Sequence, residues 1–200
     1  GGFSRKKLTV VCNFIDPVKL DCIRRCGVEE NPGDYFCYVG RLSDEKGTET
    51  MLGAAAEAGV SLKVAGDGSL LEEMRKKYAD TPAIEFLGRL GREDVVRLLR
   101  SAKASVLPSE WYENNPLGVI ESLCCGTPVI GARIGGIPEL LDETNGITFT
   151  SGNQEELTSI FRNFDHRNSF PRRMISDKAM DVFCRDTHYK LLMDAYSGKC

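Results

Sequence analysis

Short apolar runs alternate with longer helical segments along this sequence, and that alternation constrains the fold more than any other feature. Most neighbouring runs are separated by a segment with helical apolar spacing. Parallel strands need a crossover connection of a dozen or more residues, usually a helix. We therefore predict an α/β fold with a Rossmann-like parallel sheet flanked by helices. The predicted strands are residues 8–12, 35–39, 62–65, 84–87, 104–107, 129–130 and 147–149.

The segments between and beyond these runs predict the helices of such a fold. Residues 48–58 carry apolar side chains at helical spacing, and Gly59 is suited to end that helix. Ser69 is expected to cap the next helix, with Glu72 completing a capping box, whereas residues 13–34 look like a turn-rich connection. Further helices are expected after Gly91 and at residues 116–126, 138–141, 154–161, 171–183 and 187–196.

The composition excludes several classes of protein. The chain has 200 residues and a formal net charge of −3, with basic residues interspersed among acidic ones. Binding to a nucleic-acid backbone needs a basic face, so we expect no nucleic-acid partner. No apolar run approaches the ~18–20 residues that span a bilayer, and the start does not resemble a signal peptide. We expect a cytoplasmic protein, and leave open whether a longer parent associates peripherally with a membrane.

Eight cysteines raise the question of zinc or disulfides. Cys22 and Cys26 are four apart, Cys124 and Cys125 are adjacent, and no pair has the two-residue gap typical of zinc sites. Cysteine within an apolar run behaves as a small hydrophobic residue. We therefore expect reduced structural thiols, no bound metal and no cofactor.

A parallel sheet binds ligands beyond the carboxyl ends of its strands, which directs attention to the loops there. In the first loop, Arg41 and Lys46 could converge on one diphosphate, since Arg offers a planar fork and Lys a point charge. A solvated turn is the alternative. In the second loop, Gly66 and Gly68 would let a ligand approach the backbone ahead of a helix. This loop also resembles a broken dinucleotide fingerprint with Leu71 as its third position, so a dehydrogenase is another alternative.

Two carboxylates lie eight residues apart around the start of the next helix. Asn115 is a suitable N-cap and Pro116 a suitable first helical residue, and the N–H groups that follow would point toward a phosphate. Glu121, inside the helix, is placed to accept ribose hydroxyls, and Glu113, in the loop, would lie beside a sugar. A capped surface helix with two solvated acids is the alternative. The N–H groups belong to Leu117, Gly118 and Val119.

Together these segments resemble the GT-B family of retaining glycosyltransferases called glycosyltransferase group 1, or family 4. The resemblance covers residues 8–196 and keeps the order of the motifs as well as their content. Beside the E-x7-E pair, the chain carries G-R-L-S-x-E-K-G, A-G-D-G, F-L-G and G-T-P-V-I-(x)5-G-I-P-E. The context Trp111-Tyr112-Glu113-Asn114 departs from the E-x-F-G of many members and leaves the sugar contacts open.

The resemblance implies a hexosyltransferase that uses a nucleotide diphosphate sugar, such as a UDP or GDP sugar, with retained configuration and without a metal. Catalytic roles would fall to Arg41 and Lys46, which would hold the leaving diphosphate, and to Glu113, which would contact the sugar. Glu121 would bind the ribose, and the helix start at residues 117–119 would assist the phosphates. The base would lie in a pocket bordered by Leu87, Arg89, Gly66 and Gly68.

The resemblance also divides the chain. Residues 1–16 would be the interdomain linker and first strand, residues 17–183 the donor-binding domain of the C-terminal half, and residues 184–200 a helix crossing back to an absent N-terminal domain. Because that domain would hold the acceptor (a glycan, a lipid or a small molecule), we expect the isolated chain to be inactive. Two alternatives stay open: a non-catalytic nucleotide-binding module, and a sugar-nucleotide 2-epimerase of the same architecture.

Overall fold

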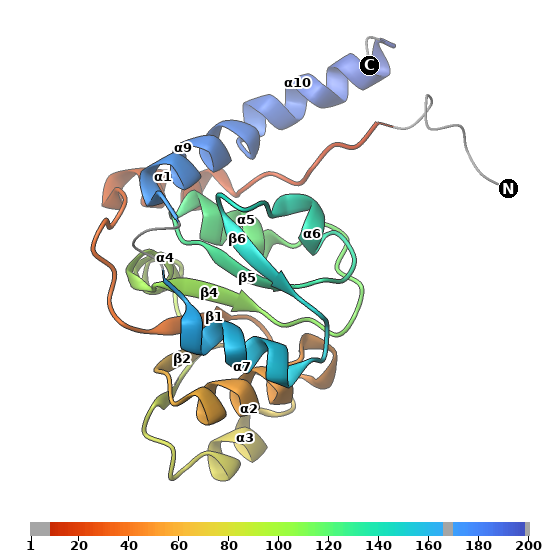
Figure 1. Ribbon diagram of the computed structural model, residues 1–200. Coiled ribbons are helices and arrows are strands. Elements are labelled where there is room, and N and C mark those ends of the chain that lie inside the picture. Colours follow the sequence, from red (N-terminus) through yellow and green to blue (C-terminus); the bar gives the residue numbers. More distant parts are fainter. Residues whose placement is uncertain (1–8, 166–169, 199–200) are drawn as a thin grey trace, which may run out of the picture.

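A parallel sheet organises the fold (Figure 1). The computed structural model describes residues 9–165 and 170–198. Its strands are β1 (Phe36–Val39), β2 (Leu62–Ala65), β3 (Ile84–Gly88), β4 (Ala104–Leu107), β5 (Val129–Ala132) and β6 (Gly146–Phe149). They pair in the order β3-β2-β1-β4-β5-β6, every pairing parallel. The predicted Rossmann-like α/β fold is therefore confirmed.

Helices cover both faces of this sheet, as parallel sheets require. They are α1 (Pro17–Cys26), α2 (Thr48–Ala58), α3 (Leu71–Lys77), α4 (Arg92–Ser101), α5 (Leu117–Cys124), α6 (Ile137–Leu140), α7 (Gln154–Asn163), α9 (Arg172–Val182) and α10 (Arg185–Tyr196), with a 3-10 turn η2 (Asp44–Lys46). One core lies under α2, α3 and α7, and the other under α1, α4, α5 and α9.

Alternate side chains of the strands fill these two cores. Phe36 and Tyr38 of β1 belong to the core under α2 and α7, whereas Cys37 between them belongs to the core under α4 and α5. This period of two, buried on both sides, is typical of a central parallel strand. Burial raises the pKa of the Cys37 thiol to about 12, so that the residue serves as a small hydrophobic side chain.

The segment before β1 differs from the prediction in two ways. The strand expected at residues 8–12 is wrong, because residues 9–16 pair with no strand of the described chain. The Ile15 N–H instead donates to the carbonyl oxygen of Phe183, just after α9. The turns expected over residues 13–34 are wrong over residues 17–26, which form helix α1.

Two predicted helix caps are also wrong. No side chain caps α3, because its N-cap residue is Leu70 and not Ser69, and the Leu70 N–H donates to the carbonyl oxygen of Leu42. Helix α5 has Pro116 at its N-cap position, one residue later than expected. The side-chain oxygen of Asn115 accepts a hydrogen bond from the Asn13 N–H instead of capping the helix.

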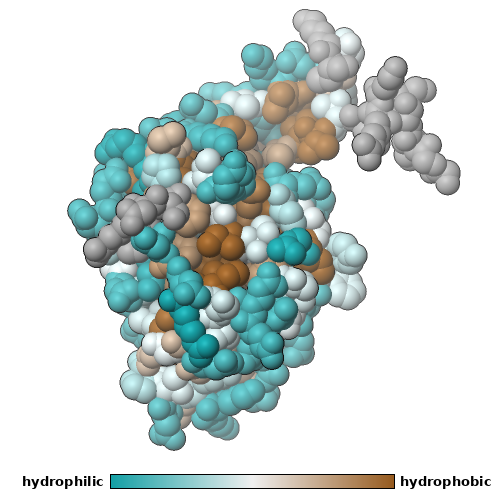
Figure 2. All heavy atoms as spheres, in the orientation of Figure 1, coloured by the Kyte–Doolittle hydropathy of each residue, from teal (hydrophilic) through white to brown (hydrophobic). Residues whose placement is uncertain are grey.

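Helix α10 projects from the body of the molecule beside the N-terminal segment (Figure 1) and buries none of its side chains. Its exposed hydrophobic residues are Tyr189, Leu191, Met193 and Tyr196. Hydrophobic side chains also gather at this end of the surface (Figure 2). Within the described ranges, the helices are all too short or too polar to span a bilayer. The division of the chain after residues 16 and 183 stays a prediction, and residues 1–8 and 199–200 lie outside the described part.

Candidate functional site

The loops beyond the carboxyl ends of β1 and β4 meet at the middle of the sheet. The chain leaves these two neighbouring strands in opposite directions, β1 toward β2 and β4 toward β5, which opens a crevice between their ends. Three adjoining cavities of about 340, 400 and 160 Å³ lie along this edge. Arg41 lines the first two, and Lys46 and Glu113 line the last two. The three residues predicted to be catalytic therefore share one crevice.

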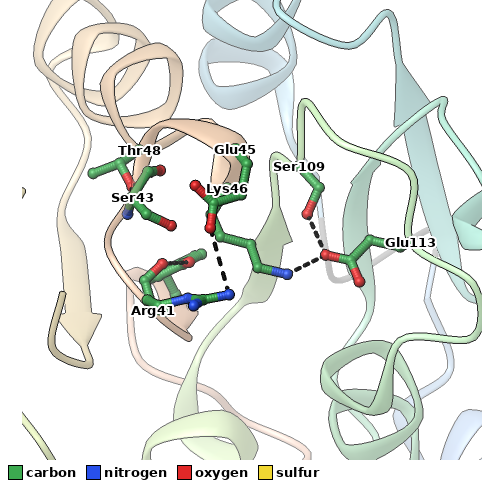
Figure 3. Close-up of polar contacts among 8 residues, drawn as sticks. Arg41, Ser43, Glu45, Lys46, Thr48, Ser109 and Glu113 are labelled. Atoms are coloured by element: carbon green, nitrogen blue, oxygen red, sulfur yellow. Dashed lines mark hydrogen bonds and ion pairs between the residues drawn. The ribbon is translucent and has the colours of Figure 1, made fainter. Parts of the chain in front are cut away.

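Lys46 and Glu113 face each other across this crevice (Figure 3). The Lys46 ammonium donates a hydrogen bond to Glu113 Oε1 in a partly buried ion pair, and Ser109 Oγ donates to the same oxygen at 2.9 Å. Lys46 ends η2 in the loop after β1, and Glu113 lies in the loop after β4. Ser109 is buried, and no sequence motif indicated it. The two loops thus hold the Lys46 ammonium and the Glu113 carboxylate together in the crevice.

Glycines allow these loops to approach so closely. Gly47 has a φ of +64°, and a Cβ atom on it would lie 2.0 Å from the carbonyl oxygen of Pro108. On the other side, a Cβ atom on Gly136 would lie 1.9 Å from the carbonyl oxygen of Asn114. The Gly136 N–H also donates to the Glu113 carbonyl oxygen at 2.6 Å. Only glycine fits at these two contacts, and both fix the loop that carries Glu113.

The sequence predicts that Gly66 and Gly68 admit a ligand, but the structure shows them admitting the loop after β1. Cβ atoms at these positions would lie 1.8 Å from the carbonyl oxygen of Gly40 and 2.1 Å from that of Leu42. Gly66 also lines the cavity of about 340 Å³, whereas Gly68 supports the loop beneath Leu42. The A-G-D-G motif therefore shapes the site partly by supporting the loop after β1.

The residues predicted to border the base are divided between surface and core. Arg89 is exposed and lines the cavity of about 340 Å³ with Arg41, whereas Leu87 packs against the core. Arg41 forms an exposed ion pair with Glu45 at 3.4 Å (Figure 3). Its carbonyl oxygen accepts a 2.6 Å hydrogen bond from the Tyr38 hydroxyl, and burial raises the pKa of that phenol. Tyr38 is therefore a neutral donor that fixes the loop after β1.

The first turn of α5 faces the cavity of about 160 Å³, which Leu117 and Gly118 line together with Lys46. No side chain caps this turn, so its N–H groups suit an anion. Val119 departs from the prediction. It is fully buried, and its N–H already donates to the carbonyl oxygen of Pro116 at 3.1 Å.

Glu121 lies one turn farther along α5 and contacts a residue outside the sequence motifs. The Nζ atom of Lys19, on α1, lies 2.5 Å from Glu121 Oε1, and each side chain is only 18% exposed. Glu121 is therefore not a solvated acid, although it does not line the three cavities. No motif indicates Lys19, because the sequence predicts turns over the residues that form α1. The available signal was Asp16-Pro17, a capping residue followed by proline at the first helical position.

The described residues include no group of metal ligands and no disulfide. Among the residues that the structure describes, no three His, Cys, Asp or Glu side chains are grouped to hold a metal ion. The seven described cysteines are all free thiols. The expectation of a site without metal or cofactor stays a prediction.

The chain is similar to known proteins in sequence. Residues 23–179 match the family described as Glycosyl transferases group 1. A glycogen synthase from Mycobacterium tuberculosis (strain CDC 1551 / Oshkosh) is 33% identical over 153 residues, which are 72% of this chain and 36% of that protein. The chain thus spans about a third of the length of this relative.

The chain is also similar to solved structures. The apo form of the lipopolysaccharide outer core galactosyltransferase WaaB matches with a TM-score of 0.81 and 20% identity, over 100% of this chain and 58% of that one. Anabaena HepE in complex with UDP-glucose matches with a TM-score of 0.71 and 21% identity, over 92% of this chain and 54% of that one. These likenesses confirm the predicted Rossmann-like part of a GT-B fold.

Proposed function

This chain belongs to the family Glycosyl transferases group 1, and from that membership we propose that it binds the donor of a retaining hexosyltransferase of family 4. The donor would be a nucleotide diphosphate sugar, with UDP and GDP sugars as the first candidates. One observation carries the proposal: Lys46 and Glu113 form a preformed ion pair beside the uncapped first turn of α5. That arrangement places a cation, an anion and a helix N-terminus around one crevice.

The diphosphate fits where positive charge is concentrated. Arg41, Lys46 and the first turn of α5 would surround it, and they would stabilise the negative charge that grows as its bond to the sugar breaks. These groups supply the positive charge that a metal ion supplies in other sites, so we propose transfer without a metal. Lys46 would exchange Glu113 for a phosphate oxygen when the donor binds, which frees the carboxylate.

The transferred sugar fits the cavity of about 400 Å³, which Glu113 lines. A free Glu113 carboxylate would accept hydrogen bonds from sugar hydroxyls. Trp111 and Tyr112, 68% and 78% exposed, line the same cavity and offer large apolar faces with a polar edge. Such faces suit a sugar ring. Glu121, one turn farther along α5, would accept hydrogen bonds from the ribose.

The acceptor would be held by a further, N-terminal domain and would be a glycan, a lipid or a small molecule. Transfer requires the acceptor hydroxyl to be oriented against the donor, which accounts for a large part of catalysis in two-substrate reactions. We therefore propose that the isolated chain binds donor and turns it over poorly. Efficient transfer by the 200-residue chain alone would contradict this part of the proposal.

The first test is a thermal-shift measurement on the 200-residue chain with UDP, GDP, ADP and their sugars. A ligand that binds only the folded state at a hundredfold excess over Kd stabilises it by about 2.7 kcal/mol. We expect one nucleotide to raise the melting temperature, and Glu121→Ala to abolish the rise. If no nucleotide binds, either to this chain or to a protein that joins it to an acceptor domain, the proposal is wrong.

Product analysis separates the alternatives. A free nucleoside diphosphate and a glycosylated acceptor indicate transfer, whereas an isomerised or eliminated sugar indicates epimerase chemistry. Nucleotide binding without transfer by a protein that joins this chain to an acceptor domain would favour a non-catalytic binding module, and unchanged transfer by its Glu113→Gln variant would remove Glu113 from the reaction.

A further inference from the structure

Residues 13–19 make two contacts near α5, one with the residue before its N-cap and one inside the helix, although they contribute no strand to the described sheet and do not line the three cavities. The first contact is at the start of α5 and the second is one turn along it. In each contact the two residues are 102 positions apart in the sequence. Since α5 carries both the proposed anion-binding turn and Glu121, contacts with it bear on donor binding.

The first contact is a two-point link between asparagines. The Asn13 N–H donates to the side-chain oxygen of Asn115 at 2.8 Å, and the Asn13 side-chain amide donates to the Asn115 backbone oxygen at 2.9 Å. Asn115 lies directly before the N-cap residue of α5. The pair therefore fixes the backbone where the loop of Glu113 enters the helix.

The second contact is the ion pair between Lys19 and Glu121. Its two side chains are each 18% exposed, whereas Lys77 and Glu49, another Lys–Glu pair in this chain, are 50% and 56% exposed. Low exposure limits screening by water, so such a pair holds its geometry better than a surface pair does. The contact with Lys19 therefore restricts where Glu121 Oε1 can lie.

Helix α1 is anchored firmly enough to position Lys19. Asp16 Oδ1 accepts hydrogen bonds from the N–H groups of Val18 and Lys19, and the Asp16 carboxylate pairs with Arg92 at the start of α4. The buried side chains of α1 pack against α4 in the core; they are Leu20, Cys22 and Ile23. The side chain of Lys19 therefore extends from a fixed helix.

We propose that residues 13–19 form a positioning clamp for the nucleotide. Lys19 orients the Glu121 carboxylate to accept the ribose hydroxyls, and Asn13 holds the start of α5 against the diphosphate. Neither residue needs to touch the donor, because each acts through the group it holds. This inference rests on the proposed function and extends it to an element outside the motifs.

The test compares the nucleoside diphosphate selected by the thermal shift with its 2′,3′-dideoxy analogue, by calorimetric titration of the 200-residue chain. If Lys19 acts through Glu121 on the ribose, Lys19→Met weakens binding of the ribonucleotide by about tenfold, or about 1.4 kcal/mol. Binding of the dideoxy analogue falls less than twofold. Asn13→Ala, which acts at the helix start, weakens both compounds by the same factor.

Two further variants make the result decisive. Lys19→Arg keeps the positive charge and is expected to keep the ribonucleotide affinity of the wild type. This variant still tests the contact if Lys19→Met fails to fold. Lys77→Met removes a lysine from the exposed pair with Glu49 and leaves both affinities unchanged. Equal weakening of the ribose and dideoxy compounds by Lys19→Met overturns the clamp alone. A wild-type chain that binds no nucleoside diphosphate overturns the proposed function and the clamp with it.

Discussion

The two acids of the E-x7-E pair each accept a hydrogen bond from a lysine, but the two lysines come from different parts of the chain. Lys46 belongs to the motif loop after β1 and lies 67 residues from Glu113. Lys19 belongs to a helix that no motif marks and lies 102 residues from Glu121. Both pairs are partly buried, with exposures of 27% and 20% for the first and 18% for each member of the second.

The difference suggests how this site separates two tasks. The Lys46–Glu113 pair lines two cavities of the crevice, so a donor is able to displace it. The Lys19–Glu121 pair lines none of the three, and its lysine is fixed by a capped helix. We interpret the first pair as one that opens during the reaction and the second as one that persists.

The largest effect should come from removing the lysine of the first pair. Lys46→Met should lower kcat for transfer by about 10²–10³-fold, the usual loss when one charge-stabilising group is removed from a transition state. Steady-state kinetics of a protein that joins this chain to its acceptor domain would measure it. The matched control is Lys77→Met, for which we expect unchanged kcat. A loss below about threefold for Lys46→Met would remove Lys46 from the reaction.

Exchanging the acids should separate the two pairs by binding alone. Glu121→Gln should weaken nucleoside diphosphate binding by about 10–100-fold, because a hydrogen bond to a charged group contributes about 1.5–3 kcal/mol. Glu113→Gln should not weaken that affinity, since Glu113 would contact only the sugar and the loss of its charge frees Lys46 for the phosphates, and it should lower the rate of transfer. Calorimetric titration with UDP, GDP or ADP measures both affinities. Equal losses in the two variants would contradict the division of tasks.

The loop of Glu113 should depend on its glycine contacts. Gly136→Ala would bring a Cβ atom within 1.9 Å of the Asn114 carbonyl oxygen, and overpacking of this kind costs about 1–3 kcal/mol. We expect the free energy of unfolding in urea to fall by that amount, and transfer to fall with it because the loop must shift. Gly91→Ala is the control, since its added Cβ atom would meet nothing closer than 3.6 Å. Equal stability of the two variants would show that the loop yields freely.

The smallest effect concerns the cap that holds α1. Backbone hydrogen bonds, first from the Lys19 N–H, hold the pKa of Asp16 below its usual value of 3.8. The cap therefore stabilises the fold fully above pH 3.8 and is lost as the pH falls through the lower folded pKa. Asp16→Asn keeps a capping side chain without titrating. Its melting temperature should lie slightly below that of the wild type at pH 7, because the variant lacks the charge that pairs with Arg92, and it should fall less between pH 4 and pH 2. Parallel curves would contradict this.

Most strands of the sheet could be predicted from the sequence, because short apolar runs separated by helical segments mark them. Residues 104–107 were predicted as a strand and form β4 with the same bounds. The segment before β1 could not be predicted in the same way. Its apolar residues at 8–12 look like a strand, but the described residues 9–12 find no neighbour to pair with. Local propensity decides little where tertiary contacts are missing or unexpected.

For the site, the sequence by itself determined which chemical groups are present and on which loops and helix they lie. Arg41, Lys46, Glu113 and Glu121 follow from motif spacing and from the rule that ligands bind at the carboxyl ends of parallel strands. Spacing cannot show what those groups contact, because hydrogen bonds between distant segments depend on packing. Only the tertiary structure decided that Glu113 faces Lys46, that Lys19 holds Glu121, and that Gly68 accommodates the backbone of Leu42.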